Sequence, residues 1–102
     1  MPFGSFINSF PPAIFLLVHL IGFGAGAFFA YRSFEAAASL LGWGFMLYAL
    51  AELCYMTYHL DWTVFLFAHT ISEVLDLVGF GLIFVGAPQH ILSTRRATAV
   101  RA

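Results

Sequence analysis

The sequence predicts an all-α integral membrane protein made of three transmembrane helices joined by short loops. Of its 102 residues, 62% are hydrophobic and only 9% are charged, whereas a soluble domain carries about 25% charged residues. Three long apolar runs are separated by short polar breaks, and each run is close to the roughly 20 residues that cross a bilayer. The length allows one domain, so we expect residues 1–102 to form a single three-helix unit.

The three apolar runs are expected to be helices at residues 13–31, 34–59 and 62–86. In hydrocarbon, a backbone must satisfy its own hydrogen bonds, and a helix does so within one segment. The strands of a membrane barrel would alternate in polarity over about 10 residues, and these runs do not alternate. Helices are therefore favoured by the lipid solvent rather than by intrinsic propensity.

The residues between the runs are typical of helix ends. Pro11 and Pro12 precede the first run, at a position where a missing N–H is harmless. Ser33 and Asp61 can cap the second and third helices through their side-chain oxygens. Pro88 follows the third run, where the chain is expected to leave the helix.

The few basic residues predict the orientation. Arg32 lies between the first two helices, and Arg95, Arg96 and Arg101 lie in a basic tail at residues 93–102. Three spans put this loop and the tail on the same side, so the positive-inside rule places the N-terminus outside and the C-terminus in the cytoplasm. We expect a protein of a prokaryotic or organellar inner membrane whose tail meets anionic lipid head groups or a partner subunit. The net charge of −1 argues against a nucleic-acid partner.

Each predicted helix carries polar residues along one face. An ionisable side chain that faces lipid costs at least about 2.5–3.5 kcal/mol, so the three stripes are expected to converge in the interior of the bundle. A spacing of three or four residues places the members of each stripe in line. The stripes are His19 with Gly22 and Gly26; Tyr48, Glu52, Tyr55 and His59; and His69, Glu73 and Asp76.

Short loops make consecutive helices antiparallel neighbours, so residues equally far from a turn lie at the same depth. Counted from the second turn, Glu52 is level with His69, and Tyr48 is level with Glu73. Counted from the first turn, His19 is level with Tyr48. We therefore expect these five side chains to form one cluster within about two helical turns.

The cluster is consistent with several roles, which the sequence leaves open. One is structural, because polar contacts between membrane helices average about 0.6 kcal/mol each. Another is a metal site, in which His19, Glu52, His69 and Glu73 would form a shell suited to Zn, Fe or Cu. Haem would use His19 and His69 as its axial pair, and a chlorophyll-type pigment would need only one of them.

A further role is proton or ion conduction. His59 is expected near the outer surface and Asp76 one turn deeper than the cluster. Together with His69, Glu52 and Glu73 they would form a ladder from the surface to the middle of the membrane. Chains of Asp, Glu and His mark proton relays in membrane proteins, so His59 and Asp76 are the candidates for the two ends of the relay.

These observations favour a subunit over an independent enzyme. The sequence has no nucleophile elbow or phosphate loop, and three helices with short loops leave no room for a substrate domain. We expect a small accessory subunit of a larger energy-transducing or redox membrane complex, whose cluster stabilises the helices or binds a metal, haem or pigment. The alternative is a self-assembling proton or ion channel, small transporter or membrane sensor. Expected partners are other membrane protein subunits or further copies of the chain, together with the lipid bilayer.

Overall fold

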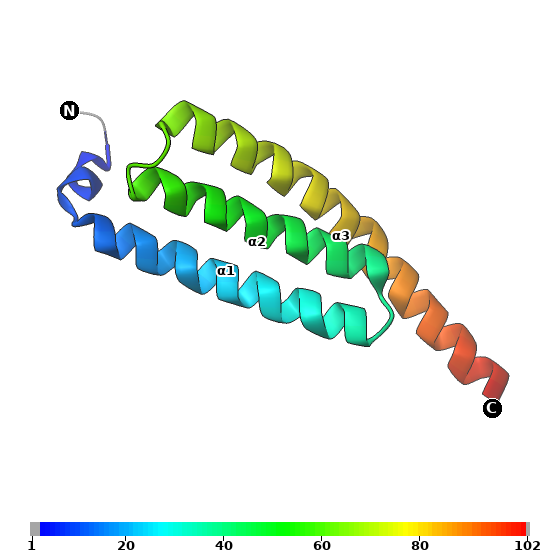
Figure 1. Ribbon diagram of the computed structural model, residues 1–102. Coiled ribbons are helices and arrows are strands. Elements are labelled where there is room, and N and C mark those ends of the chain that lie inside the picture. Colours follow the sequence, from blue (N-terminus) through cyan, green and yellow to red (C-terminus); the bar gives the residue numbers. More distant parts are fainter. Residues whose placement is uncertain (1–2, 102) are drawn as a thin grey trace.

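The computed structural model describes residues 3–101 and is built from helices (Figure 1). A short 3-10 helix, η1 (Ser5–Ser9), precedes α1 (Pro12–Glu35), α2 (Ser39–His59) and α3 (Phe65–Arg101). The three α-helices are each long and apolar enough to cross a membrane. The predicted all-α class with three long apolar helices is confirmed, whereas insertion into a membrane and its direction stay predictions.

The three long helices lie side by side as a layer, with α2 in the middle (Figure 1). Within the described residues, no Cα atom of α1 lies within 8 Å of a Cα atom of α3. The closed bundle that we expected is therefore wrong, because only α2 has a helical neighbour on two sides. Polar residues of the three helices can share a broad face of this layer, but the helices cannot enclose them.

The turn between α1 and α2 starts later than predicted. Ser33, which we expected to cap α2, is one of the last residues of α1. The N–H of Ala38 donates to the carbonyl of Ser33, and Ala37 has a φ of 59°, which together form a Schellman closure of α1. α2 then begins at Ser39, and no side chain caps it.

The turn between α2 and α3 closes in the same way. Asp61, which we expected to cap α3, has a φ of 64° and lies just past the end of α2. Here the N–H of Trp62 donates to the carbonyl of Thr57, and Asp tolerates the left-handed conformation better than most residues. α3 starts only at Phe65. Both turns are thus set by backbone closure of the preceding helix, and both predicted side-chain caps are wrong.

α3 is longer than a membrane requires. At 1.5 Å per residue its 37 residues extend about 56 Å, compared with about 30 Å of hydrocarbon. Figure 1 shows its C-terminal part running past the ends of α1 and α2. Pro88, expected to follow the helix, lies inside it, so it offers no N–H to the carbonyl of Phe84. The predicted tail at 93–102 is helical as far as Arg101, and a groove of about 500 Å³ lies between this part of α3 and the first turn.

Glycine and alanine let α2 approach both of its neighbours closely. A Cβ atom added to Gly44 of α2 would lie 2.7 Å from the carbonyl oxygen of Gly79 in α3. On the other side of α2, a Cβ atom added to Gly26 of α1 would lie 3.2 Å from the Cβ of Ala49. In lipid, helices associate through this kind of close van der Waals contact rather than through a hydrophobic driving force.

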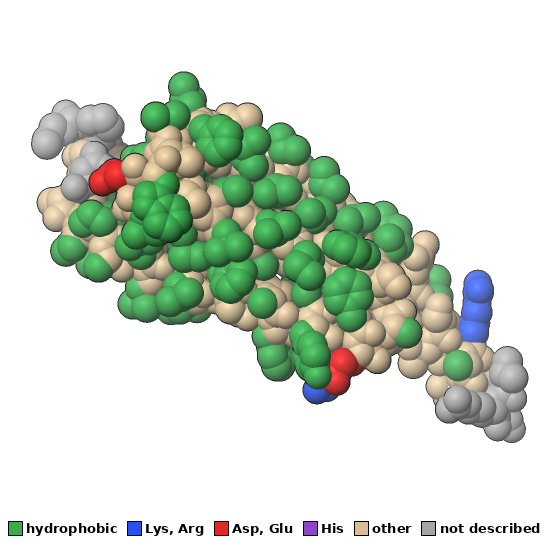
Figure 2. All heavy atoms as spheres, viewed as in Figure 1, with side chains coloured by type: hydrophobic (Ala, Val, Ile, Leu, Met, Phe, Trp, Pro, Cys, Tyr) green, Lys and Arg blue, Asp and Glu red, His purple; other side chains and the backbone are tan. Residues whose placement is uncertain are grey.

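Large apolar side chains lie on the outside of the layer. Leu50 is 41% exposed and Phe84 is 77% exposed. Figure 2 shows one face covered by apolar side chains, with acidic and basic groups toward its ends. The buried hydrophobic side chains in the described part of the chain are all alanines, namely Ala30, Ala38, Ala49, Ala51 and Ala68. Small residues between helices and large apolar residues outside are the pattern that a lipid solvent favours.

Candidate functional site

Polar side chains from all three helices meet along one face of the layer, which we call the polar face. Tyr48 marks its centre, because the ring lies against Gly26 of α1 and 6.1 Å from the ring of Phe80 of α3. The other members on α2 follow Tyr48 at intervals of three or four residues and so continue along the same side of the helix. The polar face comprises His19; Tyr48, Glu52, Tyr55 and His59; and His69, Glu73 and Asp76.

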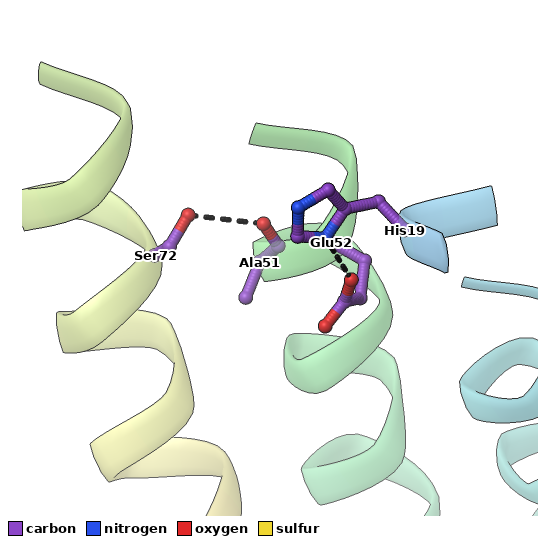
Figure 3. Close-up of polar contacts among 4 residues, drawn as sticks. All are labelled: His19, Ala51, Glu52 and Ser72. Atoms are coloured by element: carbon purple, nitrogen blue, oxygen red, sulfur yellow. Dashed lines mark hydrogen bonds and ion pairs between the residues drawn. The ribbon is translucent and has the colours of Figure 1, made fainter. Parts of the chain in front are cut away.

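The shortest contact on the polar face joins α1 to α2 (Figure 3). Nδ1 of His19 donates to Oε2 of Glu52 over 2.6 Å, and the two side chains are only 20% and 15% exposed. A hydrogen bond to a charged group is roughly twice as strong as one between neutral groups. On the other side of α2, Oγ of Ser72 donates to the carbonyl oxygen of Ala51 over 3.0 Å and joins α2 to α3. α1 and α3 are therefore both hydrogen-bonded to α2 at the same depth, at the adjacent residues Glu52 and Ala51.

Gly22 provides the space beside this ion pair. A Cβ atom added to Gly22 would lie 2.9 Å from Cδ of Glu52 and 3.1 Å from the hydroxyl oxygen of Tyr48. The carboxyl group and the phenol therefore lie together against the bare backbone of α1. Gly24, by contrast, would bring its Cβ within 4 Å of nothing. Gly22 thus belongs to the site itself.

Aromatic rings hold the His19 imidazole in place. Its ring stacks on Tyr55 at 5.0 Å between centroids and on His59 at 5.3 Å. His59 in turn stacks on Phe15 at 5.1 Å. The four rings form a column at the end of the layer where α1 begins and α2 ends. This column fixes the plane of the imidazole that bonds Glu52.

Tyr55 extends the network to α3. Its hydroxyl and Nδ1 of His69 share a hydrogen bond of 3.0 Å, and the ring of Phe65 stacks on His69 at 5.1 Å. Because Tyr55 also stacks on His19, it connects an imidazole of α1 to an imidazole of α3. The polar face therefore links all three helices, although no Cα atom of α1 lies within 8 Å of a Cα atom of α3 in the described part of the chain.

Two carboxyl groups of α3 lie deeper along the polar face. Oδ1 of Asp76 is buried and has no hydrogen-bond partner within residues 3–101. Glu73, one turn nearer to the start of α3, is exposed. Glu52 of α2 is the third carboxyl group on the polar face. Of these three carboxyl groups, only that of Glu52 is bonded to an imidazole.

The structure shifts the predicted pairing by about one helical turn between α2 and α3 and by about two turns between α1 and α2. We expected Glu52 beside His69, but Tyr55 bonds His69 and Glu52 bonds His19. We also expected His19 level with Tyr48, whereas its ring lies against Tyr55. The cause is the later position of both turns: α1 ends and α3 begins several residues beyond the predicted points, which moves both helices along α2.

The residues predicted to hold a cofactor are only partly brought together. His19 and Glu52 are in contact, but His69 is bonded to Tyr55, and Glu73 is exposed. Among the residues that the structure describes, no group of three or more His, Cys, Asp or Glu is placed to hold a metal ion. Tyr55 also lies between His19 and His69, the expected axial pair, so this arrangement does not fit a haem bound by both imidazoles.

Sequence reasoning missed the roles of Tyr55 and Ser72. The spacing puts Tyr55 on the polar stripe of α2, but counting depth from the turn pairs Glu52 with His69 and leaves Tyr55 without a partner. Ser72 is completely buried and lies four residues after Ala68 and seven before Gly79, which marks the side of α3 that packs on α2. A polar residue in such a row of small residues is a signal for a hydrogen bond between helices.

Comparisons of this chain with protein-family models, with curated proteins and with solved structures give no match.

Proposed function

We propose that this protein is a small accessory subunit of a larger energy-transducing or redox membrane complex, and that the complex covers the polar face. The supporting observation is a row of ionisable side chains along one face of helices that are otherwise apolar, in which Glu73 is exposed and Asp76 has a buried oxygen with no partner within residues 3–101. Sets of Asp, Glu and His within membrane helices mark proton pathways in pumps and transporters, which favours an energy-transducing assembly. The polar face itself would be both the contact surface and the functional part of the subunit.

The carboxyl groups of the polar face are costly to place in lipid. A charged side chain in the hydrocarbon core costs at least about 2.5–3.5 kcal/mol. His19 offsets this cost for Glu52 through their 2.6 Å contact. Glu73 is exposed, and Asp76 has a buried oxygen with no partner in the described chain. A neighbouring protein lowers the free energy of the inserted state by excluding lipid and supplying hydrogen bonds to both groups.

The proposed orientation puts the ring column on the outer side of the membrane. Arg32, Arg95 and Arg96 lie at the opposite ends of their helices, and the positive-inside rule places such residues in the cytoplasm. The polar face then opens from the outer side. The part of α3 that extends past α1 and α2 would stand in the cytoplasm, where it can contact soluble parts of the complex.

Native mass spectrometry tests the proposal. Protein carrying an N-terminal tag would be purified from its own membranes in a mild detergent. We expect a particle that contains at least one different polypeptide in fixed ratio, and denaturing detergent should release the 11.3 kDa chain. Elemental analysis and an absorption spectrum of the same sample would report any metal, haem or pigment. A particle of 11.3 kDa, or of its multiples only, would contradict the proposal.

A second candidate function is proton conduction through half of the membrane. The ring of His59 stacks on that of His19, and His19 bonds Glu52. Tyr48 lies next to Glu52, against Gly22. At 1.5 Å per residue, Tyr48 is about 16 Å from the end of α2 at His59, which is near the middle of the bilayer. Past Tyr48 this side of α2 continues with Phe45 and then Leu41. A relay of this kind would need a partner to complete the path.

Proton flux measurements test this candidate. The purified assembly would be reconstituted into vesicles that contain a pH-sensitive dye, and a membrane potential would be imposed. Glu52→Gln should lower the flux about tenfold or more because the central proton carrier is lost, whereas Glu35→Gln, an exposed carboxylate paired with Arg32, should leave it unchanged. Equal flux in the Glu52→Gln variant and the wild type would remove Glu52 from any relay.

A further inference from the structure

Two neighbouring carboxyl groups on the polar face lack a counter-charge. Glu73 and Asp76 are three residues apart on α3 and so lie on one side of the helix. Oδ1 of Asp76 is buried and unpartnered, and no ion pair of Glu73 occurs among residues 3–101. The two side chains therefore make this part of the polar face acidic, with Glu73 exposed and Asp76 partly buried.

The chain itself has no cation to offer at this depth. Of the three imidazoles on the polar face, that of His19 bonds Glu52 and that of His69 bonds Tyr55. The third, His59, lies at the outer end of α2, stacked on Phe15 and His19. The sequence contains four basic residues, all arginines: Arg32 at the far end of α1 and the others in the last eight residues.

We propose that the polar face receives a membrane-spanning helix of a different protein, and that this helix carries an Arg or Lys side chain at the depth of Glu73 and Asp76. The inference rests on the proposed function and specifies the partner. Opposite charge at matched depth gives the contact its specificity and register. A guanidinium can bond two carboxyl groups at once, and residues three apart on a helix present such a pair on one side.

A second copy of the chain is a poor occupant of the same surface. In a cyclic oligomer within a membrane, the symmetry axis runs along the membrane normal, so each residue meets groups of its own depth in the next copy. At the depth of Glu73 and Asp76 the chain presents Gly22 and Gly26 of α1 and Tyr48 and Glu52 of α2. Self-association would bring further carboxyl groups together, and like charges in contact oppose association.

Synthetic transmembrane peptides supply a defined probe. Each peptide would be a Leu/Ala helix of about 23 residues that carries Arg at its centre, Leu at its centre, or Arg near its outer end. Energy transfer from the labelled full-length protein to the labelled peptide would be measured in phosphatidylcholine vesicles. The central-Arg peptide should bind wild type about tenfold or more tighter than the central-Leu peptide, the ratio expected of one hydrogen bond between charged groups.

Neutral variants show whether the two carboxyl groups are responsible. In the double variant Glu73→Gln, Asp76→Asn the preference for the central-Arg peptide should fall to about one, whereas the matched control Glu35→Gln should keep it. Circular dichroism of each variant would confirm that the helices are formed. Equal binding of the Arg and Leu peptides to wild type, a preference that survives in the double variant, or a homo-oligomer that the double variant dissociates would each overturn the inference.

The native assembly separates this inference from the proposed function. If wild type carries a different subunit and the Glu73→Gln, Asp76→Asn variant loses it while Glu35→Gln retains it, both proposals are supported. If the double variant keeps that subunit, the protein is still an accessory subunit, but its partner does not bind through these carboxyl groups, and the inference fails. If wild type itself is a monomer, the proposed function fails, and the inference that rests on it fails as well.

Discussion

Replacing Gly44 by alanine probes the layer at its tightest point. The added Cβ would lie 2.7 Å from the carbonyl oxygen of Gly79 and 2.6 Å from Cγ1 of Ile83. The first neighbour is backbone and cannot rotate away. Ordinary contact begins near 3.4 Å, so α2 and α3 would have to separate locally by about 0.7 Å, a shift that close-packed helices resist.

The cost follows from the size of that shift. Overpacking by one methyl group costs about 1–3 kcal/mol. Alanine also favours a helix over glycine by about 1 kcal/mol, which would mask part of the loss. Gly81→Ala is the matched control, because it adds the same methyl group on α3 with nothing within 4 Å. The difference between the two variants therefore isolates packing, and we expect Gly44→Ala to be less stable than Gly81→Ala by about 1–3 kcal/mol.

Unfolding in mixed micelles measures this difference. Increasing the share of a denaturing detergent should separate α2 from α3. The fluorescence of Trp43, near the start of α2, and of Trp62, in the turn that follows α2, would follow the transition. A Gly44→Ala protein as stable as the Gly81→Ala protein would refute the reasoning, because the two helices could not then approach each other at Gly44.

Further predictions concern the polar contacts and the orientation. His19→Ala should destabilise the protein by about 1–3 kcal/mol, because Glu52 loses its partner, and adding Glu52→Gln should recover part of the loss. Additive effects of the two substitutions in the same unfolding assay would mean that the two residues do not interact. Tyr55→Phe should cost about 0.6 kcal/mol for the bond to His69, while Tyr58→Phe, whose hydroxyl makes no hydrogen bond within residues 3–101, should cost less; the reverse order of stability would place the bond elsewhere. A reporter enzyme fused to the C-terminus should be active in the cytoplasm, and activity on the outer side would reverse the proposed orientation.

The sequence predicted the helices well and their ends poorly. The apolar runs alone identify three long helices, because length and composition are what hydrocarbon selects. Ser33 and Asp61 misled the placement of the turns, since both are good N-cap residues in principle. The structure instead closes the preceding helices through their own carbonyls, with Ala37 and Asp61 in the left-handed region. Ala37 is not a residue that signals such a turn, because glycine is the usual choice.

The members of the polar face were predictable, but their pairing was not. Spacing along each helix identifies the stripes, since that argument needs only the 3.6-residue period. Pairing between helices depends on the exact centre of each turn, and an error of a few residues there moves a partner by a whole helical turn. This is why Glu52 was paired with His69 when its partner is His19. The arrangement of the helices as a flat layer was also not predicted. It depends on which sides of α2 bear the small residues Gly44, Ala49 and Ala51.

The central claim is that a different protein covers the polar face, and cross-linking from that face tests it most directly. A photoreactive phenylalanine analogue would replace either Phe80, which is 44% exposed beside Tyr48, or Leu50, which is 41% exposed on the opposite side of α2. The samples would be illuminated in native membranes. We predict that the probe at Phe80 gives a covalent adduct with another polypeptide and that the probe at Leu50 gives lipid adducts. Lipid adducts alone, or adducts to a second copy of this chain, at Phe80 would contradict the claim.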